Sequence, residues 1–185
     1  MNWNWITTYT GKRFDLEHPT PEMIDIEDIA HALSNICRWT GHTLYHYSVA
    51  QHSVNVSLMF DQRDDALWGL LHDAPEAYLG DVSQPLKALL PYYRKLESNV
   101  MDVICEKFEL PRTKPYPLAQ IDERVLFEEA RLVLADSSWL QEEPTASLVA
   151  KNPIEPLAAD HFSAMDPADA ELLFGQRFYE LTGIW

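Results

Sequence analysis

The stretch GLLHDAPEAY, residues 69–78, is the segment from which the fold and chemistry of this chain can be predicted most directly. If it is helical, His72, Asp73 and Glu76 are three and four residues apart, so their side chains project toward one region. Pro75 removes a backbone hydrogen bond, so we expect a kink there. Taken alone, a His–Asp pair on a helix is more often a structural contact than a metal site. Whether His72 and Asp73 belong to a metal site must therefore be judged from the rest of the chain.

The composition is that of a globular protein with a marked negative charge. The chain has 185 residues, 46% of them hydrophobic, and a formal net charge of -15. We expect one domain over residues 1–185 with a core at about 20–140. The charge argues against binding to a nucleic-acid polymer or an anionic membrane, although a few cations and a metal would still admit a small phosphorylated ligand. No long apolar run or secretory signal occurs, so the prediction is a soluble, cytoplasmic protein. Cys37 and Cys105 lack metal-site spacing and are predicted to be reduced core thiols.

Hydrophobic spacing indicates a mostly α, single-domain bundle with a short N-terminal β-hairpin. The hairpin is predicted at residues 3–16 and a proline-containing loop at 18–23. Helices are predicted over residues 25–38, 48–60, 63–79, 86–90, 92–108, 118–139 and 167–181. The proline-rich tail at 141–159 remains ambiguous.

Four residues on three of these helices carry the chemical signal: His52, His72, Asp73 and Asp122. A lone histidine on the apolar stripe that holds His52 is usually a core residue, so its significance lies in pairing with the next helix. Two imidazoles and two carboxylates suit one divalent transition metal ion, Mn, Co, Zn, Fe or Ni, better than a closed structural zinc site.

The order of these residues, and the segments around them, resemble the HD-domain metal-dependent phosphohydrolases. The matching segments are ICRWTG (36–41), YSVAQHS (47–53), LHDAPEA (71–77), GD (80–81) and PLK (85–87). They are similar to the branch of 5'-deoxynucleotidases and phage-type deoxynucleoside triphosphate (dATP) triphosphohydrolases, over about residues 10–135. The resemblance implies an HD-type helical bundle. Two-metal HD enzymes carry an acid directly after the His–Asp pair, where this chain has Ala74, so one metal is expected.

The resemblance also implies roles for individual residues. The metal would be held by His52, His72, Asp73 and Asp122. Arg38 would grip a phosphate, Glu76 would position or deprotonate the attacking water, and Asp81 would assist that network or contact the sugar. These roles are chemically sensible, because a carboxylate can accept the proton of a metal-activated water and a guanidinium pairs with phosphate oxygens.

Substrate contacts are expected from five further residues, and four of them also have a structural explanation. They are Lys87 and Lys114 on phosphates, Trp39 stacked on the base, Pro85 as the opposite wall, and His46 on phosphate. The lysines are alternatively solvated surface charges, Trp39 a core or interface tryptophan, and His46 a loop histidine.

The function predicted is hydrolysis of deoxynucleotides by attack of water on the α-phosphorus. A dNTP, with dATP favoured, would yield nucleoside and triphosphate. The alternatives are a 5'-deoxynucleotidase acting on dNMPs and, in another class, a nucleotide-binding regulator with little turnover. A homo-oligomer, dimer or hexamer, is expected from the six tryptophans and from the C-terminal residues Phe178, Tyr179, Leu181 and Trp185. If the chain is phage-encoded, it would act in the host cytoplasm.

Overall fold

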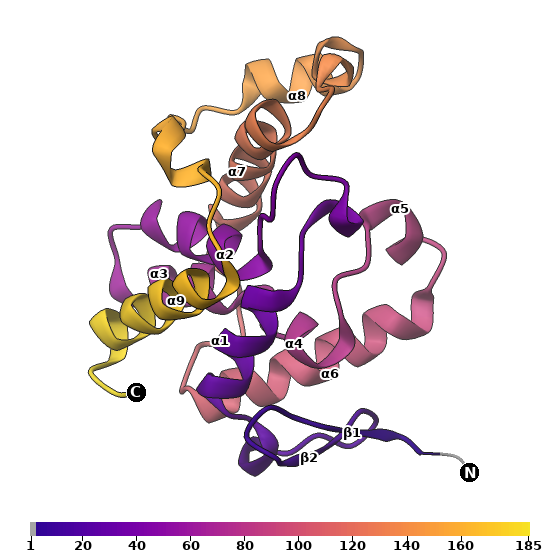
Figure 1. Cartoon of the computed structure of the whole chain (residues 1–185), viewed down its shortest axis with the longest axis vertical. Helices are drawn as coiled ribbons and strands as arrows, with labels where there is room; N and C mark the ends of the chain where they lie inside the picture. The colour runs from indigo at the N-terminus through magenta and orange to yellow at the C-terminus, as the bar shows by residue number, and fades with distance from the viewer. Residues whose placement is uncertain (1–2) are drawn as a thin grey trace.

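The structure, a computed structural model that describes residues 3–185, is mostly helical with one two-stranded antiparallel hairpin (Figure 1). This confirms the fold class predicted from the sequence. The elements are β1 (Trp5–Thr7), β2 (Arg13–Asp15), α1 (Ile26–Asn35), α2 (Val49–Leu58), α3 (Arg63–Leu71), α4 (Glu76–Leu79), α5 (Gln84–Lys87), α6 (Pro91–Lys107), α7 (Leu118–Val133), α8 (Thr145–Lys151) and α9 (Pro167–Thr182).

Helix α2 lies at the centre of the molecule, packed against α1, α3, α7 and α9. Its residues from Val49 to Ser57 are all buried, and none of them is Lys, Arg, Asp or Glu. The Ser48 side chain caps the helix by accepting a hydrogen bond from the Gln51 amide. Because α2 is covered on all sides, His52 is fully buried and held in the interior.

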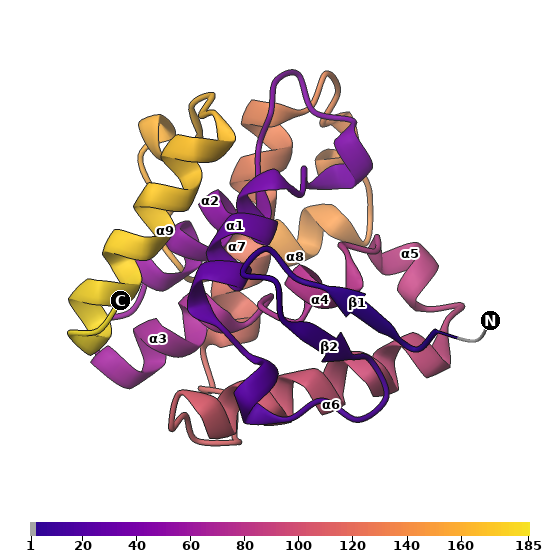
Figure 2. The same cartoon turned by 60° about the horizontal axis from the view of Figure 1, so that its bottom comes forward.

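The N-terminal hairpin lies in front of α1, α4 and α6 when the molecule is viewed from its lower end (Figure 2). Its register pairs Ile6 with Phe14, and the Phe14 ring is fully buried against the Tyr78 ring, 4.0 Å between centroids. Buried Asp28 of α1 accepts hydrogen bonds from the Thr10 amide and hydroxyl, at 2.7 and 3.0 Å. The predicted hairpin is therefore confirmed, and it is fastened to the helical core.

The expected helix at 63–79 is interrupted instead of merely kinked. Helix α3 ends at Leu71, residues 72–75 form turns, and α4 begins at Glu76. Pro75 has no amide hydrogen to continue the ladder, and the Glu76 amide bonds to the Asp73 carbonyl at 2.9 Å. His72 and Asp73 therefore lie directly after the end of α3, in the turn that leads into α4.

Other helices also have different ends from those predicted; α5, for example, spans Gln84–Lys87 where a helix at 86–90 was expected. Helix α1 stops at Asn35 because the chain continues as a bridge between Cys37 and Ser48, in which the Arg38 amide bonds to the Tyr47 carbonyl at 2.9 Å. Helix α7 stops at Val133, before residues 138–141 form a 3-10 turn. The bridge fixes the backbone at Arg38 beside the start of α2.

Smaller corrections concern the loop, the tail and the C-terminus. The loop at 18–23 includes a 3-10 turn at Pro21–Met23, and the ambiguous tail contains α8. Phe178 and Leu181 belong to the core, which leaves Tyr179 and Trp185 as exposed C-terminal aromatics. Cys105 is buried as predicted, whereas Cys37 is half-buried, and both are free thiols. Among residues 3–185, no helix is both long and apolar enough to cross a membrane.

Candidate metal centre

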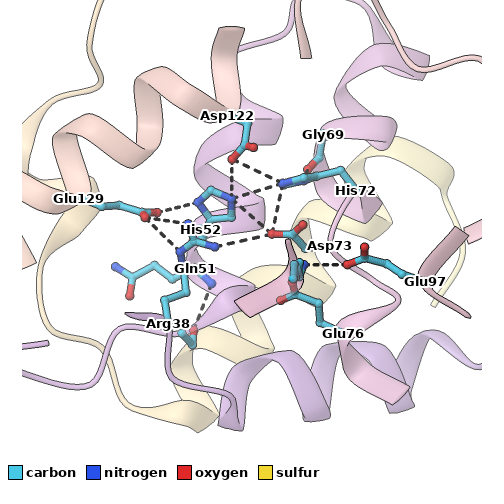
Figure 3. A network of polar contacts seen from close by, with 12 residues as sticks. Arg38, Gln51, His52, Gly69, His72, Asp73, Glu76, Glu97, Asp122 and Glu129 are labelled. Carbon is cyan, nitrogen blue, oxygen red and sulfur yellow. Dashed lines mark hydrogen bonds and ion pairs between the residues drawn. The ribbon is translucent and has the colours of Figure 1, made fainter. Parts of the chain in front are cut away.

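Two histidine rings from neighbouring elements meet at one point of the interior (Figure 3). His52 comes from the buried helix α2, and His72 from the end of α3. Their Nε2 atoms lie 3.3 Å apart. The packing of α2 against α3 brings together two residues that are twenty positions apart in the sequence.

Two carboxylates complete this cluster. The Oδ1 atom of Asp122, in the second turn of α7, lies 3.2 Å from Nε2 of His52 and 3.8 Å from Nε2 of His72. The Oδ2 atom of Asp73 lies 3.5 and 3.3 Å from the same two nitrogens. Nitrogen and oxygen ligands about 2.1 Å from a metal ion lie about 3.0 to 3.5 Å from one another. His52, His72 and Asp122 therefore form a group that can hold a metal ion, with Asp73 beside it.

The other nitrogen of each ring is occupied by a fixed acceptor. The Nδ1–H of His72 donates to the Gly69 carbonyl at 2.7 Å, and the Nδ1–H of His52 donates to Glu129 at 2.6 Å. These bonds leave both Nε2 atoms facing the centre of the cluster. Acceptors on the outer nitrogen of this kind are typical of metal-ligating histidines, whose orientation they fix.

Glu129 is the main site residue that sequence reasoning missed. It is fully buried on α7, seven residues after Asp122, and that spacing places the two on the same face of the helix. The spacing is a signal that could have identified it. Glu129 joins the metal cluster to Arg38, whose Nε donates to its Oε2 at 3.0 Å. It thus links α2, α7 and the bridge segment.

Arg38 lies close to the cluster but is already paired. Its guanidinium contacts Glu129 at 3.0 Å and Asp73 at 3.6 Å, and its side chain is 11% exposed. Burial acts to lower the pKa of Arg38, but these carboxylates outweigh it and raise that pKa. Burial and Arg38 also act to lower the pKa of His52, yet Glu129 and Asp122 raise it to about 9. Glu129 and Asp122 therefore favour positive charge at the position of the His52 ring.

Glu76 is buried and ion-paired with Lys87. The Lys87 Nζ donates to Oε1 of Glu76 at 3.0 Å and to Glu97 at 2.7 Å, and Oε2 of Glu76 has no hydrogen-bond partner among the described residues. Burial, with Asp73 and Asp81, raises the pKa of Glu76 to about 8, against the effect of Lys87. Lys87 therefore balances a buried carboxylate, which does not favour its expected role as a free phosphate-binding lysine.

A polar cavity of about 490 Å³ opens beside the cluster. Its wall includes His72, Asp73, Asp122, Lys87 and Lys114. Two further cavities are of comparable size, and each has a single charged side chain in its lining: Arg131 in one of about 600 Å³ between α7 and α8, and Glu171 in one of about 580 Å³ beside α9. The chemistry of the chain is therefore concentrated at the first cavity.

The remaining expected contacts lie outside the lining of this cavity. Asp81 is half-buried, and burial raises its pKa. Pro85 is exposed on α5. The Nε2 of His46 bonds to the Ser34 carbonyl at 3.0 Å, so His46 has a structural contact. Trp39 packs near Trp139, with 6.4 Å between centroids, and has a positive φ of 56°.

Comparison with known proteins identifies relatives without a described activity. The chain is 40% identical over 181 residues to the uncharacterized protein YfdR of Escherichia coli K12, an alignment that covers 97% of this chain and 96% of YfdR. It is 41% identical over 123 residues to the uncharacterized protein RCAP_rcc00048 of Rhodobacter capsulatus, covering 62% and 63% of the two chains. No protein-family model matches the chain. On the extent of the first match, the chain belongs to the same family as YfdR.

Proposed function

We propose that this protein is a metal-dependent phosphohydrolase of deoxynucleotides, of the HD-domain type. The observation that carries the proposal is the convergence of two imidazole Nε2 atoms with two carboxylates, at one end of a polar cavity. The outer nitrogens of both rings are held by buried or backbone acceptors, so the inward orientation is fixed. The resemblance in the sequence motifs supports the same conclusion.

The metal would be one divalent transition ion, Mn, Co, Zn, Fe or Ni, held by His52, His72, Asp73 and Asp122. Mixed nitrogen and oxygen donors suit these ions. Such an ion lowers the pKa of water and withdraws charge from a phosphoryl oxygen. Asp122 has a side chain that is 45% exposed, which leaves this side of the cluster accessible to a ligand.

The protein side chains would then handle the proton and the phosphate. Glu76 is the candidate to accept a proton from the attacking water, because its Oε2 is not committed to another group. As water attacks the α-phosphorus, the bond from that phosphorus to the 5' oxygen breaks, and the departing oxygen takes up a proton. Arg38, held in place by Glu129, would orient the Asp73 carboxylate, which lies 3.6 Å from its guanidinium.

The favoured substrate is a dNTP, whose hydrolysis would release nucleoside and triphosphate. Among the dNTPs, the resemblance in the sequence favours dATP. A cationic residue beyond the metal ligands supports the choice of a dNTP over a dNMP, since Lys114 lines the same cavity and has no carboxylate oxygen within 4.0 Å among residues 3–185. Hydrolysis of a dNMP would instead release orthophosphate. Trp39 and Pro85 remain proposed base contacts and Asp81 a proposed sugar contact.

The test is product analysis by chromatography. Metal-loaded protein is incubated with each of the four dNTPs and four dNMPs, beside Asp73→Ala and the exposed control Asp61→Ala. We expect deoxynucleoside and intact triphosphate from the wild type and the control, and none from Asp73→Ala. Orthophosphate from dNMPs alone would assign the protein to the nucleotidases. Nucleotide binding without turnover would overturn the hydrolase assignment in favour of a regulator.

A further inference from the structure

The cavity beside the metal cluster extends along helix α6. Residues spaced three or four apart on one face of α6 line it, from Arg94 to Cys105. At 1.5 Å per residue, this face spans about 16 Å. His72 and Asp122 also belong to the lining, so the cavity continues from the metal cluster. It therefore has room for a ligand much longer than one phosphate.

Two of the three cations that the sequence suggested for phosphate, Arg38 and Lys87, are already paired with carboxylates. Arg38 is paired with Glu129 and Asp73, and it does not belong to the cavity lining. Lys87 is shared between Glu76 and Glu97. A cation that balances two carboxylates has little charge left for a further anion.

Three other cations of the cavity are open to an anion. Within residues 3–185, Arg94 and Lys114 have no carboxylate oxygen within 4.0 Å. Arg112 has one contact of 3.9 Å, with Glu106, and both side chains are more than half exposed, so this contact is weak. The three come from α6 and from the segment that joins it to α7. They converge on one cavity from two separate segments.

The charge of the cavity supports the same conclusion. Its lining carries four cations, balanced by the carboxylates Asp73, Glu97, Asp102 and Asp122. A divalent ion at the metal cluster would leave an excess of two positive charges there, in a chain whose net charge is -15. An anionic ligand with several charges would be attracted to this part of an otherwise acidic protein.

We propose that Arg94, Arg112 and Lys114 form a binding site for a linear polyphosphate, such as the triphosphate tail of a nucleotide. This rests on the proposed function where the nucleotide is concerned, but the binding of inorganic triphosphate does not require turnover. The three residues give the enzyme its preference for a dNTP over a dNMP. Lys114 also lies over an aromatic ring, with its Nζ 6.0 Å from the centre of the Trp68 ring.

The test is calorimetric titration of the metal-loaded protein with inorganic triphosphate and with orthophosphate. The variants are Arg94→Gln and the triple variant Arg94→Gln/Arg112→Gln/Lys114→Gln. The matched control is Lys95→Gln, which removes one charge from the next position of α6, outside the lining. We expect triphosphate affinity to fall about 5-fold in Arg94→Gln and about 100-fold in the triple variant, with little change in the control.

Orthophosphate, which is too short to reach all three cations, should bind with similar weak affinity to wild type and variants. Equal triphosphate affinity in the wild type and the triple variant would overturn the polyphosphate site, even if dNTPs are hydrolysed. Loss of triphosphate binding in a protein that hydrolyses no deoxynucleotide would support the site and refute the proposed function. In an active enzyme, the variants should raise KM for dNTPs and leave KM for dNMPs unchanged.

Discussion

Glu129→Gln is the substitution whose effect the structure determines most clearly. Glu129 is fully buried, and its two oxygens accept from Nδ1 of His52 and from the Arg38 guanidinium. Glutamine has nearly the same shape but no charge. Its NH₂ group would face one of these donors, and the Arg38 cation would lose its buried counter-charge. The substitution therefore tests a link between the metal ligand and the arginine without creating a large cavity.

The expected loss of stability is large for a single atom exchange. Removing one partner of a buried ion pair costs about 3–5 kcal/mol. The control is Glu142→Gln, which removes the charge of an exposed glutamate that has no cation within 4.0 Å among residues 3–185, so its effect should stay within about 0.5 kcal/mol. The difference between the two variants isolates the buried network.

The assay is urea unfolding of metal-free protein, followed by tryptophan fluorescence, between about pH 2 and pH 8. Burial acts to raise the pKa of Glu129, but Arg38 and His52 lower it below its ordinary value. The stabilisation is therefore present above the unfolded-state pKa and is lost as the pH falls through the folded-state pKa. Wild type and Glu129→Gln should differ most near neutral pH and converge in acid. Equal losses for Glu142→Gln and Glu129→Gln, independent of pH, would contradict the role given to the buried Glu129 carboxylate.

Three further substitutions test other parts of the structure. Lys87→Met should destabilise the protein by about 3 kcal/mol in urea unfolding at pH 8, because Glu76 would lose its buried partner; no loss would show that the pair is not formed. Gly69→Ala should lower stability by about 1–3 kcal/mol, since the new Cβ would lie 3.1 Å from the α2 backbone, and a gain in thermal unfolding would contradict this packing. Asp28→Ala should cost about 1–3 kcal/mol and speed amide exchange in the hairpin, because Thr10 loses two hydrogen bonds; unchanged exchange would show that the hairpin is held otherwise.

The helical bundle could be predicted from the sequence because the apolar spacing of most helices is local. The helices predicted at 25–38 and 48–60 begin at Asp25 and Ser48, whose side chains cap α1 and α2. The helix ends could not be predicted as well. The end of α1 depends on a bridge between Cys37 and Ser48, eleven positions apart, and such pairings leave no periodic signal.

The group of side chains proposed to hold the metal could be predicted from the sequence because its histidines and aspartates follow one another in a recognised order. The network behind it could not. Glu129 meets His52 across 77 positions, and Lys87 turns inward to Glu76 where a surface lysine is the usual expectation. Both contacts are set by the packing of whole helices. The sequence shows which residues are charged, but it does not show which of them form ion pairs with one another in the folded protein.

The proposed activity depends most directly on the binding of one divalent ion by His52, His72, Asp73 and Asp122. The measurement is calorimetric titration of chelator-treated protein with Mn or Co, for wild type, Asp122→Asn and the control Asp102→Asn. Asp102 shares the cavity wall but is not a proposed ligand. We predict one ion per chain in the wild type and the control, and an affinity lowered about 10- to 100-fold or more in Asp122→Asn. Unchanged affinity and stoichiometry in Asp122→Asn would contradict the proposed metal centre.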